Sequence, residues 1–113
     1  MDLLYKSTRN SDNKVTASQA ILQGLSSDGG LFVPERIPAL TKTMDELSQM
    51  DYRELAYEVM KLYFTDYTEA ELRDCINQAY DDKFDTPEIA PIKEIGDAYC
   101  LELFHGATIA FKD

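Results

Sequence analysis

The stretch from Thr43 to Asp82 constrains the fold most, because it carries two helix start signals and two apolar stripes at helical spacing. Thr43 with Glu46, and Thr68 with Glu71, have the spacing of capping boxes. The stripes comprise Tyr52, Leu55, Val59, Leu62 and Tyr63, then Leu72, Cys75, Ile76, Ala79 and Tyr80. The sequence therefore predicts a pair of amphipathic helices. Their acidic outer faces are interpreted as solvated surface, with a protein-interaction surface as the alternative.

Shorter elements are expected on both sides of this helical pair. Leu3-Leu4-Tyr5 and Leu31-Phe32-Val33 have the apolar composition of short strands. Between them, Thr16 or Ser18 is expected to cap a helix that ends near Gly24. Ile92–Ile95 and Ala98–Phe104 flank the turn signal Gly96-Asp97 and predict a hairpin. The expected fold class is therefore α+β or α/β, with short strands, a helical pair and a hairpin.

Composition limits the kinds of partner. The formal net charge of -10 argues against nucleic acid and against anionic membrane surfaces. Neither a segment of membrane-spanning length nor an export signal is recognised, so a cytoplasmic location is expected. Cys75 and Cys100 are predicted to be reduced core cysteines. The acidic run 81–85 lacks the glycine and the distal glutamate of a calcium loop, so no metal site is predicted.

The most chemically suggestive residue is Lys112, near the end of the sequence. Ile109, Ala110 and Phe111 precede it without a charge, and a helix is expected to begin there. An apolar setting and a helix start both disfavour the ammonium form and so favour a nucleophilic amine. The Gly106–Thr108 region offers donors for an anion. The alternative is an ordinary solvent-facing lysine at the start of a helix.

For two other residues, His105 and Arg9, the sequence allows either a functional or a structural role. His105, which follows the predicted hairpin, has the chemistry of a general acid or base or of a structural hydrogen-bonding group. No partner for it is evident in the sequence. Arg9 lies beside the hydroxyls of Ser7 and Thr8, a set suited either to binding an anion or to holding a solvated loop with a salt bridge.

Three segments in order carry a resemblance to a known family: Tyr5-Lys6-Ser7-Thr8-Arg9, Asp28-Gly29-Gly30-Leu31-Phe32-Val33-Pro34-Glu35-Arg36-Ile37-Pro38, and Leu103-Phe104-His105-Gly106-Ala107-Thr108-Ile109-Ala110-Phe111-Lys112-Asp113. Together they resemble threonine synthases, whose cofactor-lysine segment reads Leu-Phe-His-Gly-Pro-Thr-Leu-Ala-Phe-Lys-Asp. Two positions depart from the family pattern. Ala107 stands in place of proline, which makes that loop less rigid, and Asn10 stands where glycine is frequent.

The resemblance implies a fold-type-II enzyme that uses pyridoxal 5'-phosphate to convert O-phospho-L-homoserine and water to L-threonine and phosphate. It implies that Lys112 binds the cofactor aldehyde covalently and is the catalytic residue. It also places Phe111, Asp113 and His105 in the cofactor pocket.

No Gly/Ser/Thr-rich loop for the cofactor phosphate is evident in the sequence. The chain is therefore expected to be the N-terminal portion of the enzyme, inactive alone and completed by the remainder of the same chain. The expected division is an N-terminal domain, 1–97, and the start of the catalytic domain, 98–113. The alternative is a free-standing acidic α+β module that binds a protein partner.

Overall fold

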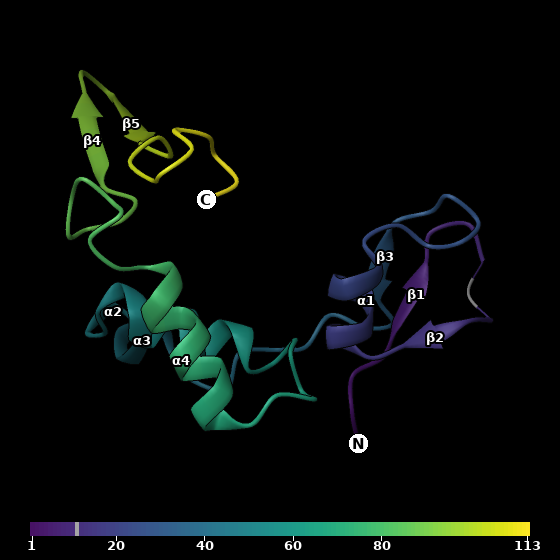
Figure 1. Ribbon diagram of the computed structural model, residues 1–113. Helices are drawn as coiled ribbons and strands as arrows, with labels where there is room; N and C mark the ends of the chain where they lie inside the picture. Colours follow the sequence, from purple (N-terminus) through teal and green to yellow (C-terminus); the bar gives the residue numbers. More distant parts are fainter. Residues whose placement is uncertain (11) are drawn as a thin grey trace. The chain divides into compact units, whose positions relative to one another are not determined.

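The computed structural model describes residues 1–10 and 12–113 and shows a mixed α/β chain of short strands and several helices, as predicted (Figure 1). The elements are β1 (Tyr5–Ser7), β2 (Lys14–Val15), α1 (Ala17–Gln23), β3 (Phe32–Pro34), α2 (Met44–Ser48), α3 (Tyr52–Met60), α4 (Glu69–Ala79), β4 (Ile92–Ile95) and β5 (Ala98–Leu101). The chain divides into two compact units, Met1–Asp74 and Cys75–Asp113, with the division inside α4.

The first unit begins with a three-stranded antiparallel sheet in the order β2-β1-β3. Tyr5 in the central strand pairs with Val15 on one side and with Pro34 on the other. The strand predicted at 3–5 begins two residues later than expected. Leu3 instead precedes the strand and is 1% exposed, so burial rather than sheet pairing accounts for its apolar character.

The turn before β3 is fastened to β1 by hydrogen bonds. Ser7 Oγ donates to Asp28 Oδ1 at 2.7 Å, and the Gly30 amide donates to the same oxygen at 2.9 Å. A Cβ on Gly30 would overlap Ser7 Oγ, while Gly29 has φ +79° and needs the left-handed freedom of glycine. The predicted turn at Asp28-Gly29-Gly30 is therefore confirmed.

Helix α1 starts and ends at the predicted signals. Thr16 is its N-cap and forms a capping box with Gln19, while Gly24 ends the helix with φ 75°. The carboxylate of Asp66, from the segment between α3 and α4, accepts hydrogen bonds from the Ser18 amide at 3.0 Å and from Ser18 Oγ at 2.5 Å. A negative group at a helix N-terminus is favourable, so Asp66 stabilises α1 from a distant part of the sequence.

The prediction of a helical pair is wrong in one respect: the segment expected to form the first helix forms two, α2 and α3. Thr43 and Glu46 form the expected capping box at α2, but α2 ends at Ser48. Asp51 then caps α3 through a further capping box with Glu54, which was not predicted from the sequence. The second predicted helix is α4, where the Glu71 amide donates to Thr68 Oγ1 at 3.3 Å.

The second unit contains the predicted hairpin of β4 and β5, with Ile92 paired to Leu101 and Ile95 to Ala98. Gly96 in the turn has φ 60°. The second strand ends at Leu101 rather than Phe104. Every residue of both strands is exposed.

The prediction that both cysteines lie in the core is wrong, because Cys75 and Cys100 are free and exposed. On α4 the buried positions are Leu72 and Ile76, four residues apart, and Cys75 lies off that row. Cys100 belongs to the hairpin, neither face of which is covered in the second unit.

Candidate functional site

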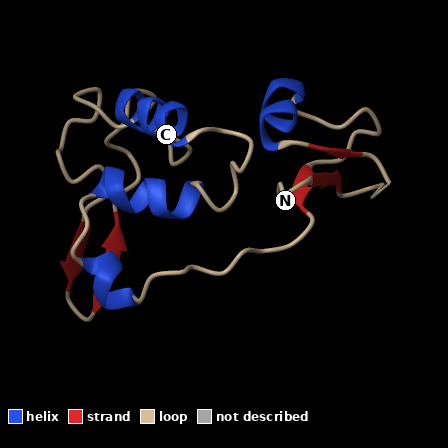
Figure 2. Ribbon diagram, turned by 90° about the horizontal axis from the view of Figure 1, so that it is seen from below, coloured by secondary structure: helices blue, strands red, loops and turns tan. Residues whose placement is uncertain are grey.

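The segment that carries Lys112 is a closed loop and not the predicted helix. Residues after β5 are drawn as loop and turn in Figure 2. The Ile109 amide donates to the Gly106 carbonyl at 3.1 Å, and the Asp113 amide donates to the Ala110 carbonyl at 3.3 Å. Ile109 has φ 59°, which no right-handed helix accommodates. The helix prediction is therefore wrong within these residues.

The carboxylate of Asp113 closes this loop. Its oxygens accept hydrogen bonds from the Thr108 amide at 2.9 Å and from the Thr108 hydroxyl. These bonds, the hydroxyl bond first, lower the pKa of Asp113 below its ordinary value. Gly106 lies against the same carboxylate, since a Cβ there would lie 2.5 Å from Asp113 Oδ2. Of the anion donors predicted in the Gly106–Thr108 region, the amide and the hydroxyl of Thr108 are thus engaged by the loop's own carboxylate.

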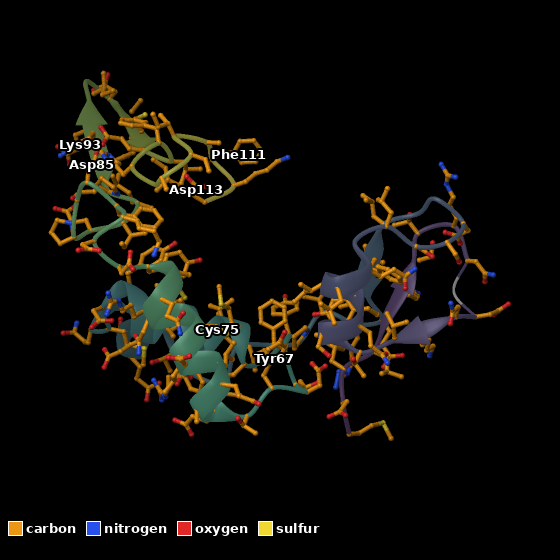
Figure 3. All side chains as sticks on the ribbon, viewed as in Figure 1. Tyr67, Cys75, Asp85, Lys93, Phe111 and Asp113 are labelled. Carbon is orange, nitrogen blue, oxygen red and sulfur yellow. The ribbon has the colours of Figure 1, made fainter. Side chains whose placement is uncertain are left out.

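Lys112 and Phe111 lie on the outside of the loop. Both are exposed, and the lysine Nζ lies 5.8 Å from the centroid of the Phe111 ring. Figure 3 shows Phe111 projecting from this loop beside Asp113. The apolar neighbours predicted for Lys112 are present, but Ile109 and Phe111 are 74% and 71% exposed and do not bury the amine.

His105 lies between two carboxylates. Its Nε2 lies 2.7 Å from Glu102 Oε2, and its Nδ1 contacts Asp85 Oδ1. The hydrogen bond to Glu102, followed by that to Asp85, raises the pKa of His105 above its ordinary value. Neither partner was predicted from the sequence. Glu102 stands only three residues away, and that spacing was an available signal, whereas Asp85 is twenty residues distant.

The hydroxyls near Arg9 have structural partners. Thr8 Oγ1 accepts the Leu31 amide at 3.1 Å, and Ser7 Oγ is bonded to Asp28. Arg9 Nη1 donates to the Asp28 carbonyl at 2.9 Å. This arrangement fits the loop-holding alternative, except that Arg9 bonds a backbone carbonyl and not the carboxylate of the predicted salt bridge. Across residues 1–10 and 12–113, no group of three acidic, histidine or cysteine side chains is suited to a metal ion.

The residues of the last loop fit pyridoxal 5'-phosphate in one respect. The exposed primary amine of Lys112 is accessible to an aldehyde, and the adjacent Phe111 ring offers an apolar surface. The Thr108 donors do not fit the cofactor phosphate in this conformation, because Asp113 holds them.

Solved structures define the class of protein. The chain is similar to a pyridoxal phosphate-bound threonine synthase from Brucella melitensis, with a TM-score of 0.82 and 30% identity over 98% of this chain and 24% of that one. It is also similar to threonine synthase from Escherichia coli, with a TM-score of 0.76 and 27% identity over 97% of this chain and 25% of that one. The fold is therefore that of the corresponding part of a pyridoxal phosphate enzyme.

Sequence comparison makes the assignment specific. Residues 4–80 match the family described as threonine synthase N terminus. The chain is 38% identical to threonine synthase of Saccharomyces cerevisiae over 97% of this chain, and 36% identical to that of Pseudomonas aeruginosa over 96%. The chain belongs to the threonine synthase family. It spans 23% and 24% of the length of these two relatives.

These matches do not favour the alternative of a free-standing interaction module, because they cover nearly the whole chain and bear the name of one enzyme. No helix among the described residues is long and apolar enough to cross a membrane.

Proposed function

We propose that this chain forms the N-terminal part of a pyridoxal phosphate-dependent threonine synthase and supplies its covalent lysine. The reaction is the conversion of O-phospho-L-homoserine and water to L-threonine and phosphate, the chemistry of a carbon-oxygen lyase acting on phosphate. The observation that carries the proposal is the accessible amine of Lys112 in a chain that aligns over 97% of its length with a threonine synthase. The bound cofactor supplies an electron sink for this chemistry.

Each residue of the last loop has a proposed part. Lys112 holds the cofactor and, when its amine is free, moves protons at the substrate. The exposed Phe111 ring offers the cofactor an apolar surface beside that amine. Asp113 fixes the loop through Thr108. His105 is proposed to line the cofactor pocket, because it directly precedes the loop that carries Lys112.

The other parts of the active site are proposed to come from the rest of the enzyme. Residues 1–97 form the N-terminal domain and residues 98–113 begin the cofactor-binding domain. The remaining length of the matched relatives would correspond to the cofactor phosphate site and most contacts to the substrate. The 113 residues alone are therefore expected to be inactive. A cytoplasmic location also stays a prediction.

Reductive trapping tests the role of Lys112. The chain is joined to the remaining part of the Saccharomyces cerevisiae enzyme in place of the matching segment. This chimera is incubated with pyridoxal 5'-phosphate, reduced with borohydride, digested and mapped by mass spectrometry. The expected result is preferential labelling of Lys112 over Lys93, which lies on an exposed strand of the same unit and serves as the internal control. Lys112→Arg should abolish that label and leave the label on Lys93 unchanged. Equal labelling of the two lysines would count against a built cofactor lysine.

A further inference from the structure

His105 makes three contacts that join separate parts of the second unit. Nδ1 contacts Asp85, in the loop after α4, and Nε2 contacts Glu102, directly after β5. The main chain adds a third contact, because the Asp85 amide donates to the His105 carbonyl at 3.1 Å. Glu102 is itself fixed, since its amide donates at 3.0 Å to the carbonyl of Pro91, the residue before β4. The imidazole thus ties the loop after α4 to the hairpin.

Both ring nitrogens face carboxylate oxygens, which accept hydrogen bonds and do not donate them when ionised. A neutral imidazole carries one N–H group, so it satisfies only one of the two carboxylates. The imidazolium carries two and satisfies both. Glu102 and His105 are shielded, with side chains 18% and 14% exposed, whereas Asp85 is 72% exposed. The arrangement is therefore complete only when His105 is protonated.

The contact lies at the base of the loop that carries Lys112. The His105 carbonyl is held by Asp85, and the next residue, Gly106, starts the turn that Asp113 closes. The Phe104 ring lies against the imidazole, with the ring centroids 4.4 Å apart and the planes tilted by 31°. Asp85 and Glu102 are the charged groups that act on the ring among the described residues.

We propose that His105, protonated between Asp85 and Glu102, is a positioning residue that holds the Lys112 loop in place in a proton-dependent manner. This proposal rests on the proposed function, because Lys112 matters only as the cofactor lysine. Since the two carboxylates raise the pKa of His105, the contact is present below the ordinary histidine value of about 6.5. One of the two imidazole–carboxylate hydrogen bonds is lost as pH rises through the raised folded-state pKa of His105.

Nuclear magnetic resonance of the 113-residue chain tests the proposal directly, because His105 is its single histidine. The imidazole resonance is expected to titrate with a midpoint above about 6.5. Asp85→Asn and Glu102→Gln should each lower that midpoint. The control Glu94→Gln removes the same charge from the same hairpin and should leave the midpoint unchanged. A wild-type midpoint at or below the ordinary value would overturn the proposal, even if a variant failed to fold.

The positioning role has its own readout. The amide resonances of Gly106, Thr108 and Ile109 are expected to shift with the same midpoint as the imidazole. That pH dependence should disappear in His105→Gln. If the imidazole titrates with a raised midpoint while these amides stay unchanged, the positioning role is overturned. These readouts need no cofactor, so a failure of reductive trapping at Lys112 is a separate result that rejects the proposed function.

Discussion

At the scale of single residues, the turns are closed by short side chains that contact backbone amides. Asp28 accepts bonds from the Ser7 hydroxyl and from the Gly30 amide, and these bonds, in that order, lower the pKa of its carboxyl. Asp113 does the same with Thr108 at the other end of the chain. In both places a glycine leaves room for the carboxylate or hydroxyl beside it. Each turn therefore requires a glycine without a Cβ at this position, in addition to its hydrogen bonds.

Gly30→Ala tests this at the first turn. The added Cβ overlaps Ser7 Oγ, so the free energy of unfolding should fall by about 1–3 kcal/mol, the usual cost of overpacking. Chemical denaturation of the purified chain measures the loss. Combining Gly30→Ala with Ser7→Ala removes the overlapping oxygen, so the two losses should not add. Strictly additive losses would show that the overlap is not the cause.

At the scale of elements, local signals predicted the helix starts well. Thr16, Thr43 and Thr68 all begin helices, and each makes a reciprocal bond with a residue three positions later. The break between α2 and α3 was missed because apolar spacing alone does not reveal an interruption. Asp51 with Glu54 was the available signal, since aspartate also caps helices.

Asp51→Ala is expected to destabilise α3 by about 1 kcal/mol, a typical loss for an N-cap. The Asp51 carboxylate accepts the Glu54 amide at 2.9 Å, and alanine leaves that donor without its partner. Circular dichroism during denaturation measures the change. Asp51→Ser retains a capping oxygen and should preserve most of the stability. An equal loss in both variants would mean that the cap contributes little.

The candidate site was harder to predict, because its geometry depends on contacts between residues that are not adjacent in sequence. The position of Lys112 after an apolar segment was visible, but Asp113 folds back on Thr108 and replaces the expected helix with a loop. The hydrogen-bond partners of His105 are Asp85 and Glu102, and only Glu102 is close to His105 in the sequence. Capping motifs act within four residues, whereas these contacts require the fold.

At the scale of the whole molecule, the hairpin of the second unit exposes large apolar side chains on both faces. On one face, Ile92 and Leu101 lie opposite one another and are 64% and 53% exposed, and Tyr99 is 74% exposed; on the other face, Ile95 is 64% exposed. Two-stranded hairpins with uncovered faces gain little stability from burial. The exposed surface is consistent with a chain that spans about a quarter of the length of its relatives.

The 113-residue chain should therefore increase the fluorescence of a hydrophobic dye such as anilinonaphthalene sulfonate in its folded state. Ile92→Thr combined with Leu101→Thr should reduce that increase. Ile37→Thr, at an exposed position of the first unit, is the matched control and should have a smaller effect. A dye-silent, monodisperse wild-type chain would contradict this interpretation of the hairpin.

The central claim is that this sequence acts as the N-terminal part of a threonine synthase with Lys112 as its cofactor lysine. The most direct measurement replaces the matching segment of the Saccharomyces cerevisiae enzyme, to which the chain is 38% identical, and assays the chimera for threonine and phosphate. We predict that the chimera releases both products from O-phospho-L-homoserine and that Lys112→Ala abolishes their formation while the chimera stays folded. A folded chimera that is inactive, or one whose activity survives Lys112→Ala, would contradict the account.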